Sequence, residues 1–187
     1  HYVLCLSEAK GMNIIMKIGI ISDIHGNIIA LKACISYMKS VPCDEYFFLG
    51  DYISDTPYTR ETIDYVYDFC SKHNCIFLRG NREDYMLEQR RIIAQGVENG
   101  KWRWNSATGN LLFAYRQLNE KDFLFFEHLP ISYQYSKMGY PDVTICHGSP
   151  VSSRERLLIE GENTKVWLKK INTDYLICAH THLPGEL

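Results

Sequence analysis

The amino-acid sequence predicts an α/β domain, and three observations lead to this fold class. Short apolar runs without polar alternation indicate strands that are covered on both faces. Segments with apolar residues at helical spacing stand between these runs, so strand and helix patterns alternate along the chain. The length of 187 residues is enough for one domain of this kind with a sizeable core.

The first half of the chain contains a strand, helix, strand, helix, strand series. The strand patterns cover residues 17–22, 45–49 and 75–78. The first helix pattern begins after Asn27, which offers an N-cap, and its apolar positions are Ile28, Leu31, Ile35 and Met38. The second helix pattern covers residues 60–72. Such a series predicts a parallel sheet with right-handed crossovers.

The second half is richer in helix before it returns to strands. Helix patterns cover residues 83–95 and 107–118, and Asn119 can cap a short helix through residue 127. Strand patterns follow at residues 131–135, 143–146 and 175–178. A further helix pattern, at residues 164–171, precedes the last strand. No internal repeat, low-complexity tract or linker interrupts this order, which favours a single domain.

Side chains that can bind metal follow most of the predicted strands. The set consists of Asp23, His25, Asp51, Asn81, His147, His180 and His182. Ligands of α/β sheets bind beyond the carboxyl ends of the strands, so these side chains are expected to meet at one edge. Each short motif is weak evidence alone, and a lone His-x-His is more often structural than catalytic. The specificity comes from the ordered set.

Two pairs in this set have a spacing of two residues. Asp23 and His25 would point the same way in an extended segment, and the same holds for His180 and His182. Such a pair can chelate one metal or divide between two adjacent metals. Carboxylate, amide and imidazole ligands without thiolate suit manganese, iron, nickel or zinc better than copper(I) or an iron–sulfur cluster. A two-metal site can bind phosphate oxygens and activate water.

The ordered set resembles the calcineurin-like metallophosphoesterase superfamily, in particular its small bacterial and archaeal phosphodiesterases, over about residues 16–187. The resemblance implies a four-layer α/β/β/α sandwich with mixed sheets. It also implies two divalent metal ions, with manganese expected first and iron, nickel or zinc as alternatives. By motif position, Asp23, His25, Asp51 and His182 would hold one metal. Asp51, Asn81, His147 and His180 would hold the other.

The chemistry that the resemblance implies is metal-dependent hydrolysis of a phosphoester, by a phosphodiesterase or phosphatase. A bridging hydroxide would attack phosphorus directly and in line, without a covalent enzyme intermediate. The residues expected to take part in catalysis are Asn81, Arg82 and His147. The expected substrate is a small phosphoester, and a nucleotide is one candidate.

Arg82 departs from the family pattern, because many members have His after the Asn of this motif. A guanidinium stays protonated at any working pH, so Arg82 is a poor general acid. It can clamp a phosphate oxygen, or it can point to solvent or pair with Glu83 or Asp84. In the second motif, Ser54 and Asp55 replace the Asp and Arg of protein Ser/Thr phosphatases. That activity is therefore disfavoured.

The two ends of the chain give further expectations. Residues 1–15 are predicted to be an N-terminal appendage, because the chain begins with His1 and the first strand pattern opens at Met16. Met12 is the other candidate start. The domain is expected to cover residues 16–187. Family members usually continue past the His-x-His motif, so we expect either a C-terminal truncation or a smaller second sheet.

The composition excludes several classes of partner. A formal charge of -2 and a pI near 6.4 argue against binding of long nucleic acids, which needs a basic surface. The apolar runs are shorter than the roughly 20 residues of a membrane helix.

Seven cysteines without a Cys-x-x-Cys pair indicate reduced thiols and a cytoplasmic protein. The oligomeric state is not predicted.

A second hypothesis for the function is a non-catalytic interaction scaffold of the same fold. Arg82 and the short C-terminus favour the scaffold. The complete ligand set favours the hydrolase, because scaffold members of the family tend to lose ligands. Metal analysis separates the two, since a scaffold would not retain about two metals per chain.

Overall fold

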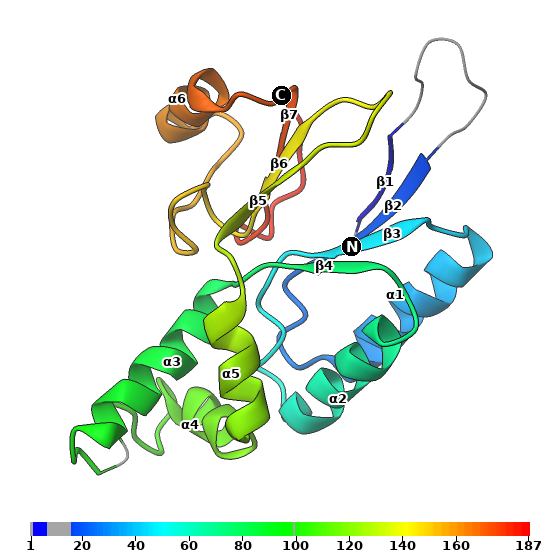
Figure 1. Ribbon diagram of the computed structural model, residues 1–187. Coiled ribbons are helices and arrows are strands. Elements are labelled where there is room, and N and C mark those ends of the chain that lie inside the picture. The colour runs from blue at the N-terminus through cyan, green and yellow to red at the C-terminus, as the bar shows by residue number, and fades with distance from the viewer. Residues whose placement is uncertain (1, 7–15, 99) are drawn as a thin grey trace.

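A computed structural model describes residues 2–6, 16–98 and 100–187. Within these residues the chain forms two β-sheets and six helices (Figure 1). The fold is therefore of the mixed α/β class that the sequence predicts. Among the described residues, no helix is long and apolar enough to cross a membrane.

The first sheet has the strand order β1-β2-β3-β4. Its strands are β1 (Tyr2–Leu6), β2 (Met16–Ile21), β3 (Glu45–Phe48) and β4 (Cys75–Phe77). Strands β2, β3 and β4 are parallel, and the helices α1 (Ile28–Ser40) and α2 (Thr59–Cys70) connect them. Both helices lie on the same face of this sheet (Figure 1). The predicted parallel series is thus confirmed.

Strand β1 was not among the strands predicted from the sequence. It pairs antiparallel with β2, with Tyr2 opposite Ile20 and Leu6 opposite Met16. It lies within the segment predicted to be an appendage, of which residues 1 and 7–15, with the candidate start Met12, fall outside the described residues. The first sheet is therefore mixed.

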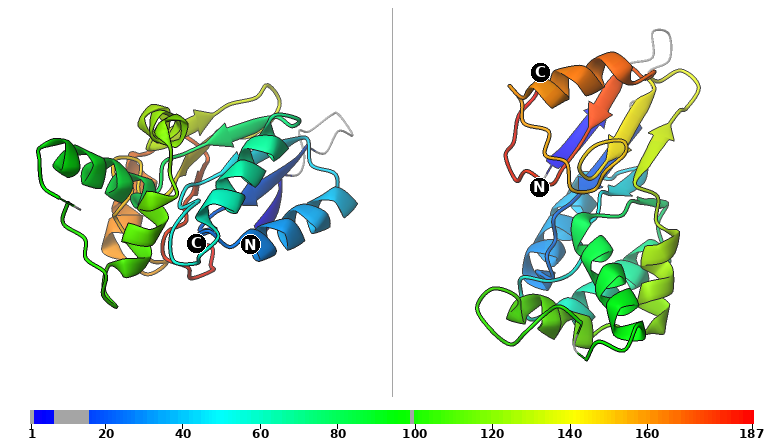
Figure 2. Two further views of the ribbon diagram at one scale, coloured as in Figure 1. Left: turned by 90° about the horizontal axis from the view of Figure 1, so that it is seen from below. Right: turned by 90° about the vertical axis from the view of Figure 1, so that its left-hand side faces the viewer.

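The second sheet has the order β5-β6-β7 and is also mixed. Its strands are β5 (Ser132–Tyr135), β6 (Val143–Cys146) and β7 (Tyr175–Ile177). Strand β5 is antiparallel to β6, and β6 is parallel to β7. Helix α6 (Glu162–Lys170) lies on the side of this sheet that faces away from the first sheet (Figures 1 and 2).

Three helices that come between β4 and β5 along the chain form a separate helical unit. They are α3 (Asn81–Ala94), α4 (Gly109–Arg116) and α5 (Glu120–His128). The unit lies beside α2, at the end of the first sheet (Figures 1 and 2). Asn119 caps α5 as predicted, because its side chain accepts a hydrogen bond of 3.3 Å from the Asp122 N–H.

Two apolar cores hold these elements together. The core between the two sheets contains Met16, Ile18, Ile20, Phe47, Leu49, Leu78, Tyr135, Val143 and Ile145. The other core, between the first sheet and the helices, includes Phe48, the neighbour of Phe47. Successive residues of β3 therefore point into different cores. This explains why the apolar runs lack polar alternation.

Candidate metal centre

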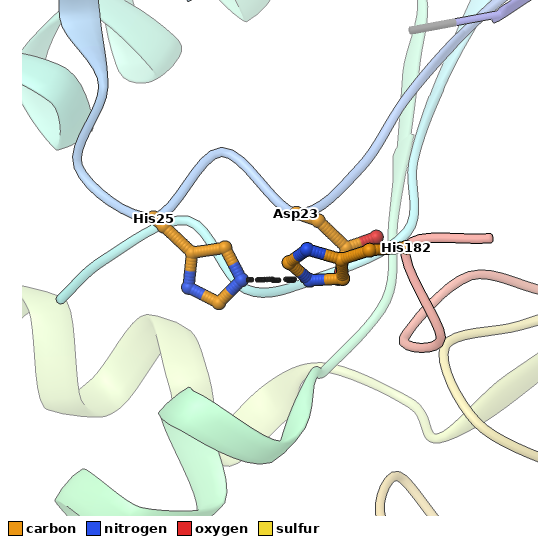
Figure 3. Close-up of side chains that lie close together, drawn as sticks. All are labelled: Asp23, His25 and His182. Atoms are coloured by element: carbon orange, nitrogen blue, oxygen red, sulfur yellow. Dashed lines mark hydrogen bonds and ion pairs between the residues drawn. The ribbon is translucent and has the colours of Figure 1, made fainter. Parts of the chain in front are cut away.

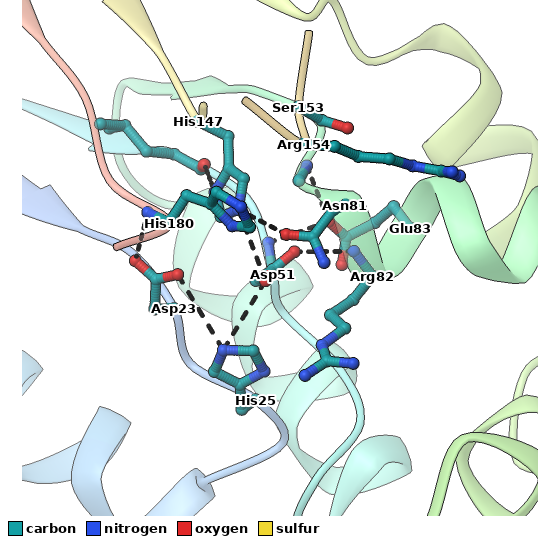
Figure 4. A network of polar contacts seen from close by, with 12 residues as sticks. Asp23, His25, Asp51, Asn81, Arg82, Glu83, His147, Ser153, Arg154 and His180 are labelled. Atoms are coloured by element: carbon teal, nitrogen blue, oxygen red, sulfur yellow. Dashed lines mark hydrogen bonds and ion pairs between the residues drawn. The ribbon is translucent and has the colours of Figure 1, made fainter. Parts of the chain in front are cut away.

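All seven predicted ligands follow strands of the two sheets and are brought close together. Figure 4 shows all of them except His182, which Figure 3 shows beside Asp23 and His25. Asp23 and His25 follow β2, Asp51 follows β3, Asn81 begins α3 after β4, His147 follows β6, and His180 and His182 follow β7. The first sheet and the start of α3 thus carry four of these side chains, and the second sheet carries three. The centre lies where the carboxyl ends of the parallel strands in both sheets come together.

The backbone at the two closely spaced ligand pairs differs from the extended segments expected from the sequence. Asp23 and His25 have φ values of 52° and 50°, and His180 and His182 have values of 66° and 57°. These left-handed conformations are uncommon for residues other than Gly. The expectation of extended pairs is wrong, because each segment makes tight turns directly after its strand. Backbone contacts hold one of these turns, including a hydrogen bond of 2.9 Å from the His25 N–H to the Asp51 carbonyl.

The first ligand group contains Asp23, His25 and His182 (Figure 3). The Nε2 atoms of the two imidazoles are 3.2 Å apart, and His182 Nε2 is 3.2 Å from Asp23 Oδ1. One donor atom from each residue lies within 4.8 Å of the others. Asp23 Oδ1 is buried and makes no hydrogen bond within the described residues. Converging ligand atoms and a buried carboxylate oxygen without a hydrogen bond fit a divalent cation.

The second ligand group contains Asp51, His147 and His180, whose donor atoms also lie within 4.8 Å of one another. His147 Nδ1 lies 2.8 Å from the Leu49 carbonyl, which can only accept a hydrogen bond, so Nδ1 carries a proton. Its Nε2 lies 3.0 Å from Asn81 Oδ1 and 3.4 Å from Asp51 Oδ2. Nε2 can meet these two oxygens either by carrying a proton or by binding a cation that the three atoms share. This set therefore also fits a metal ion.

Asp51 lies between the two groups and is almost completely buried. Its Oδ2 is 3.6 Å from His25 Nε2 in the first group and 3.4 Å from His147 Nε2 in the second. Its Oδ1 accepts a hydrogen bond of 2.8 Å from the Arg82 N–H. This single carboxylate can therefore contribute to both groups.

The carboxylates make the centre favourable for positive charge. Burial of the His147 ring opposes protonation, but the Asp51 carboxylate outweighs it and raises the pKa of His147 to about 9. For His25, burial is likewise outweighed by the carboxylates of Asp55 and Asp51, so its pKa is also raised. A divalent cation would be attracted by the same field and would displace these protons.

The family model described as calcineurin-like phosphoesterase matches residues 16–184. The chain belongs to this family. Membership indicates metal-dependent hydrolysis of phosphoesters, in agreement with the two ligand groups. No curated protein matches the chain by sequence.

Two solved structures share the fold of this chain. A hypothetical protein from Pyrococcus horikoshii OT3 superposes with a TM-score of 0.72 at 19% identity, over 89% of this chain and 70% of its own length. A metallophosphoesterase from Sphaerobacter thermophilus gives a TM-score of 0.67 at 22% identity, over 90% of this chain. This chain spans 62% of the Sphaerobacter protein.

In this phosphoesterase, Glu83 supports the centre, a role that was not predicted from the sequence. Its side chain is completely buried and accepts hydrogen bonds of 2.9 Å from the N–H groups of Gly80, Asp51 and Tyr52. Burial and the nearby Asp51 raise the pKa of Glu83 to about 7. A partial sequence signal exists, because Glu83 is the third residue after the N-cap Gly80 and accepts from its N–H, which is one half of a capping box.

Arg82 has a different partner from those predicted. Its guanidinium donates to Asp55 Oδ2 at 2.9 Å, whereas Glu83 accepts backbone N–H groups and Asp84 pairs with Arg79 at 2.9 Å. The alternative of a pair with Glu83 or Asp84 does not occur, because the left-handed turn at Asp55 brings that carboxylate to the edge of the centre. Figure 4 shows the Arg82 side chain beside Asn81 and near His25.

Proposed function

We propose that this chain is a dinuclear metal-dependent phosphodiesterase or phosphatase that acts on a small phosphoester. The observation that supports it best is Asp51, whose Oδ2 lies within 3.6 Å of a ligand atom in each group. Asp23, His25, Asp51 and His182 would hold one metal. Asp51, Asn81, His147 and His180 would hold the other. The catalytic domain would comprise residues 16–187.

We propose Mn²⁺ as the metal, with iron, nickel and zinc as alternatives, because the donors are carboxylate, amide and imidazole. Two divalent ions bound here would activate water and neutralise charge on the phosphoryl oxygens. His147 donates from Nδ1 to the Leu49 carbonyl, so Nε2 is the ring nitrogen that would bind the metal once it has lost its proton. Asn81 places its amide oxygen beside that nitrogen.

Arg82 would contact a phosphate oxygen at the edge of the centre. Its backbone is fixed to Asp51 and its guanidinium to Asp55, and a quarter of its side chain is exposed. A guanidinium donates hydrogen bonds to phosphate readily but does not release a proton to a leaving group. Esters whose leaving group has a low pKa are therefore the expected substrates, and a nucleotide diester is one candidate.

The direct test is hydrolysis of bis-p-nitrophenyl phosphate and p-nitrophenyl phosphate by metal-free protein after addition of Mn²⁺. Asp51→Asn should lower kcat by more than about 100-fold, because loss of an outer partner of a metal ligand already costs up to about 100-fold. The matched control Asp64→Asn changes an exposed ion pair on α2 and should retain full activity. Absence of hydrolysis of both esters by the Mn²⁺-loaded protein contradicts the proposal.

The second candidate is a non-catalytic interaction scaffold of the same fold. The replacement of the family's His by Arg82 favours it, because Arg82 cannot serve as a general acid. Metal analysis of dialysed protein separates the two functions. Retention of about two metals per chain supports the hydrolase, and the lack of bound metal together with the lack of hydrolysis supports the scaffold.

A further inference from the structure

Asp55, in the loop after β3, connects three separate segments of the chain. Its Oδ2 lies 3.0 Å from His25 Nδ1 and accepts a hydrogen bond of 2.9 Å from Arg82 Nη2. Its Oδ1 accepts a hydrogen bond of 2.8 Å from Asn110 Nδ2 on α4. One carboxylate thus joins a candidate metal ligand, the start of α3 and the start of α4.

The contact with Asp55 orients the His25 ring. Because Nδ1 faces Asp55, the other ring nitrogen, Nε2, faces the first ligand group and lies 3.2 Å from His182 Nε2. The Asp55 carboxylate favours a proton on Nδ1, so in the neutral ring the lone pair lies on Nε2 and is available to a metal. Outer partners of this kind set the orientation and basicity of metal-binding imidazoles.

Arg82 is held at both ends by carboxylates of the same loop. Its backbone N–H donates to Asp51 Oδ1 at 2.8 Å, and its guanidinium donates to Asp55. The Arg82 side chain is 25% exposed and that of Asp55 is 35% exposed, so the pair lies at the edge of the centre rather than in the core. Asp55 therefore determines where the guanidinium stands.

The backbone of the loop is shaped for this arrangement. Ser54 and Asp55 have φ values of 74° and 62°, both in the left-handed region. Asp and Asn adopt this conformation more readily than other residues except Gly. The two turns bring the Asp55 carboxylate back toward His25, which lies on another strand end.

We propose that Asp55 is a positioning residue of the metal centre, which holds His25 toward the metal and keeps Arg82 at the edge of the site. The proposal rests on the proposed metal binding by His25 and adds a residue outside the ligand set. The carboxylate accepts hydrogen bonds from Arg82 and Asn110 and faces His25 Nδ1 at 3.0 Å, whereas an Asn side chain offers one acceptor oxygen and brings two donors of its own. Asp55→Asn therefore disrupts these contacts while suiting the same backbone conformation.

The decisive measurement is metal affinity, obtained by titrating Co²⁺ into metal-free protein and following its visible absorption. Asp55→Asn should weaken one binding step by about 10- to 100-fold, the usual cost of losing an outer partner of a metal-bound imidazole. His182→Ala should weaken the same step, which assigns that step to the first ligand group. Asp64→Asn, which alters a surface ion pair with Arg60, should leave both steps unchanged.

Two further variants separate the contacts of Asp55. Asn110→Ala removes only the contact with Oδ1, so it should weaken the Co²⁺ step less than Asp55→Asn does. At saturating Mn²⁺, KM for bis-p-nitrophenyl phosphate should rise in Asp55→Asn and in Arg82→Ala. The double variant should show no additional rise, because both changes act on the same guanidinium.

The outcomes distinguish this role from the proposed function. The metal-free Asp55→Asn protein should unfold at the same denaturant concentration as the wild type, which excludes loss of the fold as the cause. Unchanged Co²⁺ affinity in this variant overturns the positioning role and leaves the hydrolase proposal standing. Weakened affinity in a protein that hydrolyses no phosphoester supports the positioning role and overturns the proposed function.

Discussion

At the scale of single residues, Glu83 ties two strand ends together beneath the candidate metal centre. It accepts N–H groups from Asp51 and Tyr52, which follow β3, and from Gly80, which follows β4. Asp51 itself has a left-handed backbone with φ of 55°. The hydrogen bond from the Asp51 N–H to Glu83 helps to hold the Asp51 carboxylate between the two ligand groups.

Removal of this carboxylate should destabilise the metal-free protein. In Glu83→Ala, three buried N–H groups lose their acceptor, and each unsatisfied group costs about 1–3 kcal/mol. We expect a loss of about 3 kcal/mol or more in the free energy of unfolding, measured with urea. Glu160→Ala, at an exposed position, should change it by less than about 0.5 kcal/mol. Equal effects of the two substitutions would contradict the role assigned to Glu83.

At the scale of elements, the apolar patterns predicted the strands and helices because each pattern reflects burial. The strand at residues 143–146 has the predicted ends, and the helix predicted at 60–72 spans Thr59–Cys70. Strand β1 was not predicted, since its pairing with β2 depends on the tertiary fold rather than on its own short sequence. Helix ends were shifted by one or two residues where caps and turns decide them.

The cap of α5 gives a prediction at this scale. Asn119 accepts from the Asp122 N–H, and Asp122 in turn accepts from the Asn119 N–H at 2.8 Å. Asn119→Ala should lower the free energy of unfolding by about 1 kcal/mol, the typical value of an N-cap. Asn119→Ser, which keeps an oxygen at the cap, should lose much less in the same urea titration. A Ser variant as unstable as the Ala variant would show that the cap is not the cause.

At the scale of the whole molecule, the core between the sheets brings the ligand groups together. Asp23 and His25 follow a strand of the first sheet, whereas His182 follows a strand of the second. The sequence could predict that ligands from different strands lie close together, because each ligand follows a strand. It could not predict the partners of Arg82 and Glu83, which depend on how loops about 30 residues apart approach each other.

The inter-sheet core should therefore control metal binding as well as stability. Ile145 is completely buried between the sheets, and Ile145→Ala should cost about 2–5 kcal/mol in the free energy of unfolding. The affinity for Co²⁺ should fall as well, because the sheets carry different ligands. Leu168→Ala, at a position that is 42% exposed on α6, serves as the control. Loss of stability without loss of metal affinity would show that the groups assemble independently of this core.

The distance along the chain between His25 and His182 has a consequence for the order of folding. Their Nε2 atoms are in contact although the residues are 157 positions apart. Contacts of such long range close late and slow the folding of a domain, because the loop entropy must be lost first. During synthesis, the first ligand group stays incomplete until His182 has left the ribosome. Metal uptake at that group would then mark the end of folding rather than its beginning.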